Sequence, residues 1–234
     1  MPLAPNSRRQ SVQGSTPIGT PRSSHEVVNV IESLAQSFFY NVKDLHKTES
    51  PDQVPTDRLS LHHSFGFESS KRNNLHFIED NVLLYSTGNV VHFLRLEDGS
   101  ITYLQGQEGG GIGAIAVHPS RKFFAVAEKG KFPHIYIYEY PTLRLYRLLR
   151  RGTERGYSDL CFNAAGTKLA SVGSSPDFML TVWNWIEEQT ILRTKAFAQE
   201  VYRVTFSPTD DGQLVTSGMG HIRFWKMART FTGQ

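Results

Sequence analysis

The glycine-rich stretch EGGGIGAIAVHPS, at residues 108–120, carries the residue types that most directly suggest chemistry. Residues 111–116 match G-x-G-x-x-A, a pattern whose glycines let a helix N-terminus approach the pyrophosphate of a dinucleotide. Pro119 falls where the second turn of that helix would lie, and proline breaks a helix interior. Alternating apolar residues over 115–125 instead indicate strands. We interpret the match as accidental and predict no nucleotide cofactor.

Histidine, cysteine and serine residues form no pattern typical of a catalytic or metal site. Nine histidines are present, but His62 and His63 are adjacent, and the others lie singly without cysteine partners or a His-x-x-x-His pair. Cys161, the single cysteine, sits in an apolar alternation. This predicts a buried thiol in a reducing compartment. With no G-x-S-x-G motif either, the sequence predicts a protein that is not an enzyme and has no metal, cofactor or small-molecule substrate.

Charge and hydropathy argue against two further classes of protein. Lysine and arginine number 25 against 22 acidic residues, for a net charge of +3, and they are scattered along the chain. A nucleic-acid partner is therefore not predicted. There is no run of roughly 18 apolar residues, as a membrane span requires, and no charged-then-apolar leader. We expect a protein of the cytosol or of a structure attached to it.

Composition divides the chain into three parts. Residues 1–24 are rich in Pro, Ser, Gly, Thr and Arg, which predicts a disordered tail. Apolar residues recur at three- and four-residue intervals over 25–46, which indicates an amphipathic helix packed on the domain, or alternatively a docking helix for a partner. Two prolines and several turn formers then predict a linker up to residue 57. From residue 58 onward the pattern is that of short, dense β-strands.

Beyond residue 58 the sequence repeats itself. Each copy has an apolar strand that ends in a turn, a strand of small residues, a glycine-containing turn and a strand that bears an aromatic residue. Three clear copies span residues 112–140, 156–185 and 200–227, and a weaker one spans 74–100. The aromatics Tyr138, Trp183 and Trp225 hold equivalent positions, 45 and 42 residues apart.

A period in the low forties, with about four strands per unit and an aromatic near the end of the third, resembles the WD-repeat family of β-propellers. The resemblance implies that Tyr138, Trp183 and Trp225 fill the space between successive sheets. Asn184 and Lys226 stand where the family usually has aspartate after tryptophan. The predicted fold is all-β, a WD-repeat β-propeller whose blades span about 58–105, 106–151, 152–196 and 197–230.

Four copies span about 170 residues, whereas seven blades need about 300. The propeller is therefore expected to be incomplete, a truncated form or splice product of a longer chain. Closure of four blades on themselves, or pairing with a second copy, are the alternatives. An open stack would expose an apolar face and a strand edge.

Four long strings narrow the family: RLSLHHSFGFESSKRNNLHFIEDN, GGGIGAIAVHPSRKFFAVAEKG, IYEYPTLRLYRLLRRGTERGYSDL and MLTVWNWIEEQTILRTKAFAQEVYRVTFSP. Over roughly residues 58–230 they resemble the N-terminal propeller region of WD-repeat proteins of the motile axoneme, large chains with tandem propellers followed by coiled coil. The resemblance implies a non-catalytic scaffold in the tether that links inner dynein arm motor heads to doublet microtubules, and so a regulator of ciliary and sperm flagellar beating. Its implied partners are axonemal tether subunits, a sister WD-repeat protein, the inner dynein arm and the doublet microtubule. The alternative is a general WD-repeat adaptor in another cytosolic assembly.

The segment PTLRLYRLLRRGTERG, at residues 141–156, is rich in arginine. One interpretation is an amphipathic basic helix for a membrane, calmodulin or acidic tubulin tails. Its place between the third strand of one copy and the first strand of the next instead favours an outer strand and its connection, with the arginines on the rim. Such a rim would aid docking to an acidic filament through charge complementarity. The predicted interaction residues are Arg144, Arg147, Arg150 and Arg151.

Overall fold

The computed structural model describes residues 61–227, so the tail, helix and linker predicted over residues 1–57 lie outside the described residues, as does the end of the last predicted blade. Within 61–227 the regular structure consists of fifteen strands. They form four antiparallel sheets. None of these described residues forms a helix able to cross a membrane. The predicted all-β fold of successive blades is confirmed.

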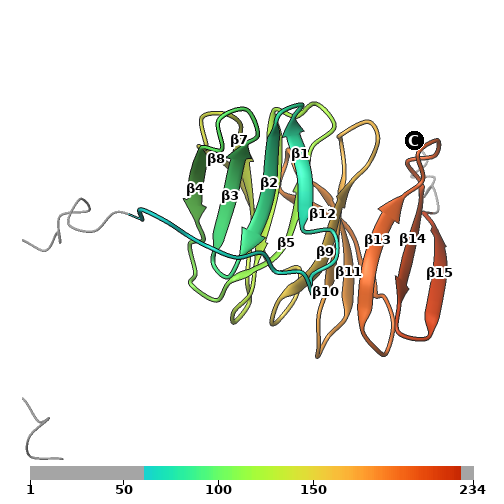
Figure 1. Ribbon diagram of the computed structural model, residues 1–234. Coiled ribbons are helices and arrows are strands. Elements are labelled where there is room, and N and C mark those ends of the chain that lie inside the picture. The colour runs from blue at the N-terminus through green and yellow to red at the C-terminus, as the bar shows by residue number, and fades with distance from the viewer. Residues whose placement is uncertain (1–60, 228–234) are drawn as a thin grey trace, which may run out of the picture. The chain divides into compact units, whose positions relative to one another are not determined.

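Each sheet is a simple meander in which consecutive strands pair, and we number the sheets blades 1 to 4 in chain order. Figure 1 shows them following one another from the green strands β1–β4 to the orange and red strands β13–β15. The strands of blades 1 and 2 are β1 (Leu75–Glu79), β2 (Val82–Thr87), β3 (Val90–Arg95), β4 (Ile101–Gln105), β5 (Ile112–Val117), β6 (Phe123–Glu128), β7 (Ile135–Glu139) and β8 (Leu145–Leu149). Those of blades 3 and 4 are β9 (Tyr157–Phe162), β10 (Leu169–Gly173), β11 (Met179–Asn184), β12 (Gln189–Lys195), β13 (Val201–Phe206), β14 (Gln213–Gly218) and β15 (His221–Lys226).

The core consists of three apolar clusters, one between each pair of consecutive blades. Strand β6 contributes side chains to two of these clusters. Phe124 and Val126 pack toward blade 1, and the alternate residues Ala125 and Ala127 pack toward blade 3. Because successive side chains of a strand point to opposite faces, a strand buried on both sides must be apolar at nearly every position. This is why the middle blades have continuous apolar runs.

Blades 1 and 4 each have an apolar face that the described residues leave uncovered. On β1, Leu75 and Phe77 are 51% and 52% exposed, and on β15 Ile222 and Phe224 are 67% and 83% exposed. The open stack expected from the sequence therefore presents apolar surface at both ends, of the kind that marks protein contacts.

Two of the three predicted blade aromatics make the same contact. The indole Nε1 of Trp183 donates to Ser171 Oγ at 3.0 Å, and that of Trp225 donates to Thr216 Oγ1 at 2.9 Å. In each blade the bond joins the third strand to the second. Tyr138 holds the corresponding position between blades 1 and 2, where burial raises the pKa of its hydroxyl. Indole N–H groups usually form a hydrogen bond when they are buried. Blades 3 and 4 therefore share this hydrogen bond as well as the spacing of their tryptophans.

Replacing Trp183 by phenylalanine is expected to lower the free energy of unfolding by about 2 kcal/mol, because it removes a buried hydrogen bond and leaves a small void. Trp183 is 1% exposed, whereas Trp225 is only partly buried. The matched change Trp225→Phe should therefore cost less than half as much. Urea unfolding followed by circular dichroism measures both; equal losses would contradict the assignment of Trp183 to the core.

Candidate interaction surface

The glycine-rich stretch forms a strand and a turn. Gly113 lies within β5, and the chain turns between β5 and β6 at His118, whose N–H donates to the carbonyl oxygen of Phe123 at 3.0 Å. A Cβ atom at Gly113 would lie 2.6 Å from the carbonyl oxygen of Tyr157 in β9. Only glycine lets the first strands of blades 2 and 3 come this close. No helix begins after these glycines, so the geometry that a dinucleotide site needs is missing here.

The positions of the possible metal ligands and of the single thiol in residues 61–227 bear on whether a reactive site is present. Within residues 61–227 no three His, Cys, Asp or Glu side chains gather as metal ligands would. The partly buried thiol of Cys161 donates to the carbonyl oxygen of Phe162 at 3.2 Å. Burial raises the pKa of this thiol, so it stays protonated and is a poor nucleophile.

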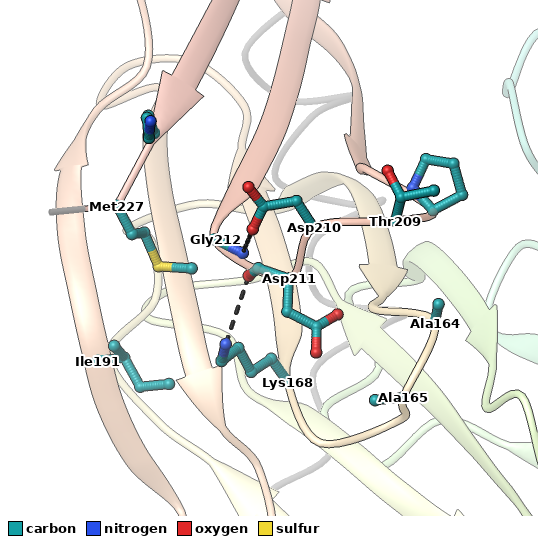
Figure 2. A pocket seen from close by; sticks show the side chains of 11 residues that line it. Ala164, Ala165, Lys168, Ile191, Thr209, Asp210, Asp211, Gly212 and Met227 are labelled. Carbon is teal, nitrogen blue, oxygen red and sulfur yellow. Dashed lines mark hydrogen bonds between the residues drawn. The ribbon is translucent and has the colours of Figure 1, made fainter. Parts of the chain in front are cut away.

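A cavity of about 1110 Å³ lies where loops of blades 3 and 4 meet. Figure 2 shows Lys168 Nζ donating to the backbone oxygen of Asp211, and the Gly212 N–H donating to Asp210 Oδ1. The lining holds two lysines, the second being Lys226, and the two aspartates. The formal charges of the lining therefore balance. The Lys168 ammonium and the Asp210 carboxylate already form hydrogen bonds within the protein.

The arginine-rich segment forms the outer strand expected from the repeat. Strand β8 pairs with β7 at the edge of blade 2, which excludes the basic-helix interpretation. Arg144 precedes this strand and lies 3.8 Å from Glu139. Arg147, on the strand, donates to the carbonyl oxygen of Ile186 in blade 3 at 2.8 Å. These two arginines thus have partners within the fold.

Arg150 and Arg151 differ from the other two predicted arginines. Both are exposed and follow directly after β8. Within residues 61–227 neither guanidinium forms a salt bridge or a hydrogen bond with another side chain or with the backbone. The structure therefore separates the four predicted rim residues into two with internal partners and two that are available to a partner molecule.

A polar junction that was not predicted joins three blades. Asp159, on β9, is 1% exposed. Its Oδ1 accepts a hydrogen bond from Asn73 Nδ2 at 3.0 Å, and its Oδ2 accepts one from the N–H of Val204 at 3.0 Å. Asn73 precedes β1 in blade 1, and Val204 lies on β13 in blade 4. Burial raises the pKa of Asp159, although the hydrogen bonds partly offset this effect.

The sequence did carry a signal for this junction. Asp159 is a charged residue in the apolar strand YSDLCF, and a buried charge must find partners. Its partners were not predictable, because Asn73 lies 86 residues away and Val204 lies 45 residues away. Trp185 was also missed: its Nε1 donates to the carbonyl oxygen of Gly166, and the ring packs on His118 between blades 2 and 3.

Comparison with known proteins identifies relatives of this chain. No protein-family profile matches it. It is 47% identical to cilia- and flagella-associated protein 44 of mouse over 97% of this chain, and 50% identical to the protein of that name from Chlamydomonas reinhardtii over 75%. It is also 28% identical over 79% of its length to human echinoderm microtubule-associated protein-like 1.

The matched regions are small parts of longer proteins. The chain covers 13% of the mouse protein, 10% of the Chlamydomonas protein and 24% of the human one. The resemblance seen in the sequence is confirmed: this chain is a homologue, over nearly its whole length, of one segment of cilia- and flagella-associated protein 44.

Proposed function

We propose that this chain is a non-catalytic WD-repeat scaffold of the ciliary and flagellar axoneme. The observation that carries the proposal is the identity to cilia- and flagella-associated protein 44, which extends over 97% of the chain. A relative named for microtubule association supports a cytoskeletal location. Blades over residues 58–230 would supply surfaces for other proteins, and the uncovered faces of blades 1 and 4 support such a use.

The finer role that we propose is in the tether between inner dynein arm motor heads and doublet microtubules, where the scaffold would regulate cilium and sperm flagellum motility. Its partners there would be axonemal tether subunits, the sister WD-repeat protein, the inner dynein arm and the doublet. The arginine rim supports contact with an acidic surface, chiefly through Arg150 and Arg151, because Arg144 and Arg147 already have partners within the fold.

Fractionation of flagella tests this proposal. The full chain carrying a small tag is expressed in a flagellated cell, and the flagella are extracted with detergent. We expect the tagged chain to stay with the axoneme, whereas the tag alone is lost with the soluble matrix. Proximity labelling from the tag should then enrich inner dynein arm subunits and the sister WD-repeat protein.

Two outcomes would contradict the proposal. A chain confined to the cell body, or washed out with the matrix, would favour the general adaptor in another cytosolic assembly. Axonemal retention without enrichment of inner dynein arm subunits would keep the scaffold role and remove the tether role.

A further inference from the structure

A second cavity, of about 550 Å³, lies on the surface near the end of β8. Arg150 and Arg151 form one side of it, Phe132 comes from the loop between β6 and β7, and Arg193 comes from β12. Three arginines from blades 2 and 3 thus line one hollow together with an aromatic residue. Arg193 is far from the predicted basic segment in sequence and joins it only through the fold.

Backbone and side-chain hydrogen bonds hold the walls of this cavity in place. The N–H of Phe132 donates to the carbonyl oxygen of Glu154 at 2.9 Å, so the loop before β7 is tied to the connection between β8 and β9. Thr153 Oγ1 donates to Asp177 Oδ1 at 2.7 Å, and the Glu154 N–H donates to Asp177 Oδ2 at 3.2 Å. A preformed site loses less conformational entropy when a ligand binds.

The charges in the cavity do not balance. Its lining holds three arginines and one acidic residue, Glu154. The nearby carboxylate of Asp177 accepts hydrogen bonds from Thr153 and from the Glu154 N–H and keeps its negative charge, so three arginines face two acidic residues and the surroundings stay positive. In the part of the chain that the structure describes, none of the three arginines forms a salt bridge, in contrast to Arg121 and Arg144. The cavity therefore carries a net positive charge that an anionic ligand could neutralise.

Two residues that line the cavity, Phe132 and Arg151, have a strained backbone conformation. Phe132 is 55% exposed and has a φ of 55°, and Arg151 has a φ of 67°. Residues with side chains rarely adopt this left-handed conformation, which costs about 1 kcal/mol or more for each residue. The ring of Phe132 is thereby held at the surface beside the three arginines, where it offers apolar contact area to a ligand.

We propose that this cavity binds an acidic, glutamate-rich peptide segment of a partner protein. Arginine forks bind carboxylates with two parallel hydrogen bonds, and the methylene groups of a glutamate side chain would pack on Phe132. Glu154 lowers the net charge of the lining, so a doubly charged phosphate gains less attraction here than the three arginines alone would give. A nucleic acid would require a long basic path, and the net charge of this chain is only +3. This site deepens the contact with an acidic surface that we propose for Arg150 and Arg151, and it rests on that contact but not on the axonemal location.

Fluorescence anisotropy with the full chain and a labelled glutamate octapeptide tests the site. We expect binding that weakens as salt is added, since ions screen exposed charges. The triple change Arg150→Ala, Arg151→Ala and Arg193→Ala should weaken it by at least about tenfold. The matched control Arg144→Ala, on the same segment but outside the cavity, should change Kd by less than about twofold.

Three results would overturn the inference. They are no binding of the octapeptide at low salt, equal binding by the triple variant and the wild type, and stronger binding of a phosphopeptide or an oligonucleotide of the same charge. Substitution of exposed arginines should leave the melting temperature nearly unchanged. If the triple variant fails to fold, the single change Arg193→Ala, compared with Arg144→Ala, repeats the test.

Discussion

Replacing Gly113 by alanine is expected to lower the free energy of unfolding by about 3 kcal/mol, because the new methyl group would overlap backbone atoms. Its Cβ would lie 2.6 Å from the carbonyl oxygen and 3.2 Å from the amide nitrogen of Tyr157, and 3.3 Å from the carbonyl oxygen of Ala127. The strands β5 and β9 are each hydrogen-bonded within their own sheet, so their backbone cannot move aside as a flexible side chain can. Blades 2 and 3 would have to separate, and the apolar cluster between them would open.

Gly109→Ala is the matched control in the same glycine run. No atom lies within 4 Å of its added Cβ, so its cost comes only from the positive φ of 73° and should be about 1 kcal/mol. Thermal unfolding of both variants measures the difference, with a fall of about 10 °C expected for Gly113→Ala. A smaller loss for Gly113→Ala than for Gly109→Ala would mean that β5 and β9 are not in close contact.

Replacing Asp159 by alanine is expected to cost about 3 kcal/mol, since it leaves the N–H of Val204 and the amide of Asn73 without their buried acceptor. The matched change Asp80→Ala removes an aspartate that is 95% exposed and paired with Arg121. It should cost less than about 0.5 kcal/mol. Urea unfolding compares the two, and equal losses would refute the junction.

The protonation of Asp159 gives this prediction a pH dependence. Burial raises its pKa in the folded state above the unfolded value, so the folded state binds this proton more tightly. The stability that the group contributes is therefore lowest above its folded pKa and rises as the pH falls through that value toward the unfolded pKa. Relative to Asp159→Asn, the wild type should gain stability on acidification across this window. A difference that does not change with pH would show that the carboxylate is not buried.

Local patterns in this chain predicted the strands well for a clear physical reason. A blade is a meander whose strands pair with their neighbours in sequence, so turn residues and apolar runs nearly determine it. Tyr138, Trp183 and Trp225 could be assigned because the repeat returns them to equivalent positions. The outer strand β8 could be placed in the same way, against the alternative of a basic helix.

Contacts between blades could not be predicted from such local sequence patterns. Asp159 bonds to Asn73 and Val204 across three blades, and Arg193 and Arg150 line one cavity across two, because packing brings together residues that no local spacing relates. The same limit applies to the four predicted rim arginines. Equal in the sequence, they differ in the structure because only Arg144 and Arg147 lie next to acceptors.

By itself the sequence determined that this protein is a repeat of four-stranded units, since apolar periodicity and turn chemistry act over a few residues. It also determined that the G-x-G-x-x-A match is no phosphate cradle, since Pro119 and the strand alternation are local. Only the tertiary structure decided why Gly113 must be glycine, which carboxylate joins the blades and which arginines remain available. Each of these depends on the distance between atoms far apart in the chain, and blade packing alone sets that distance.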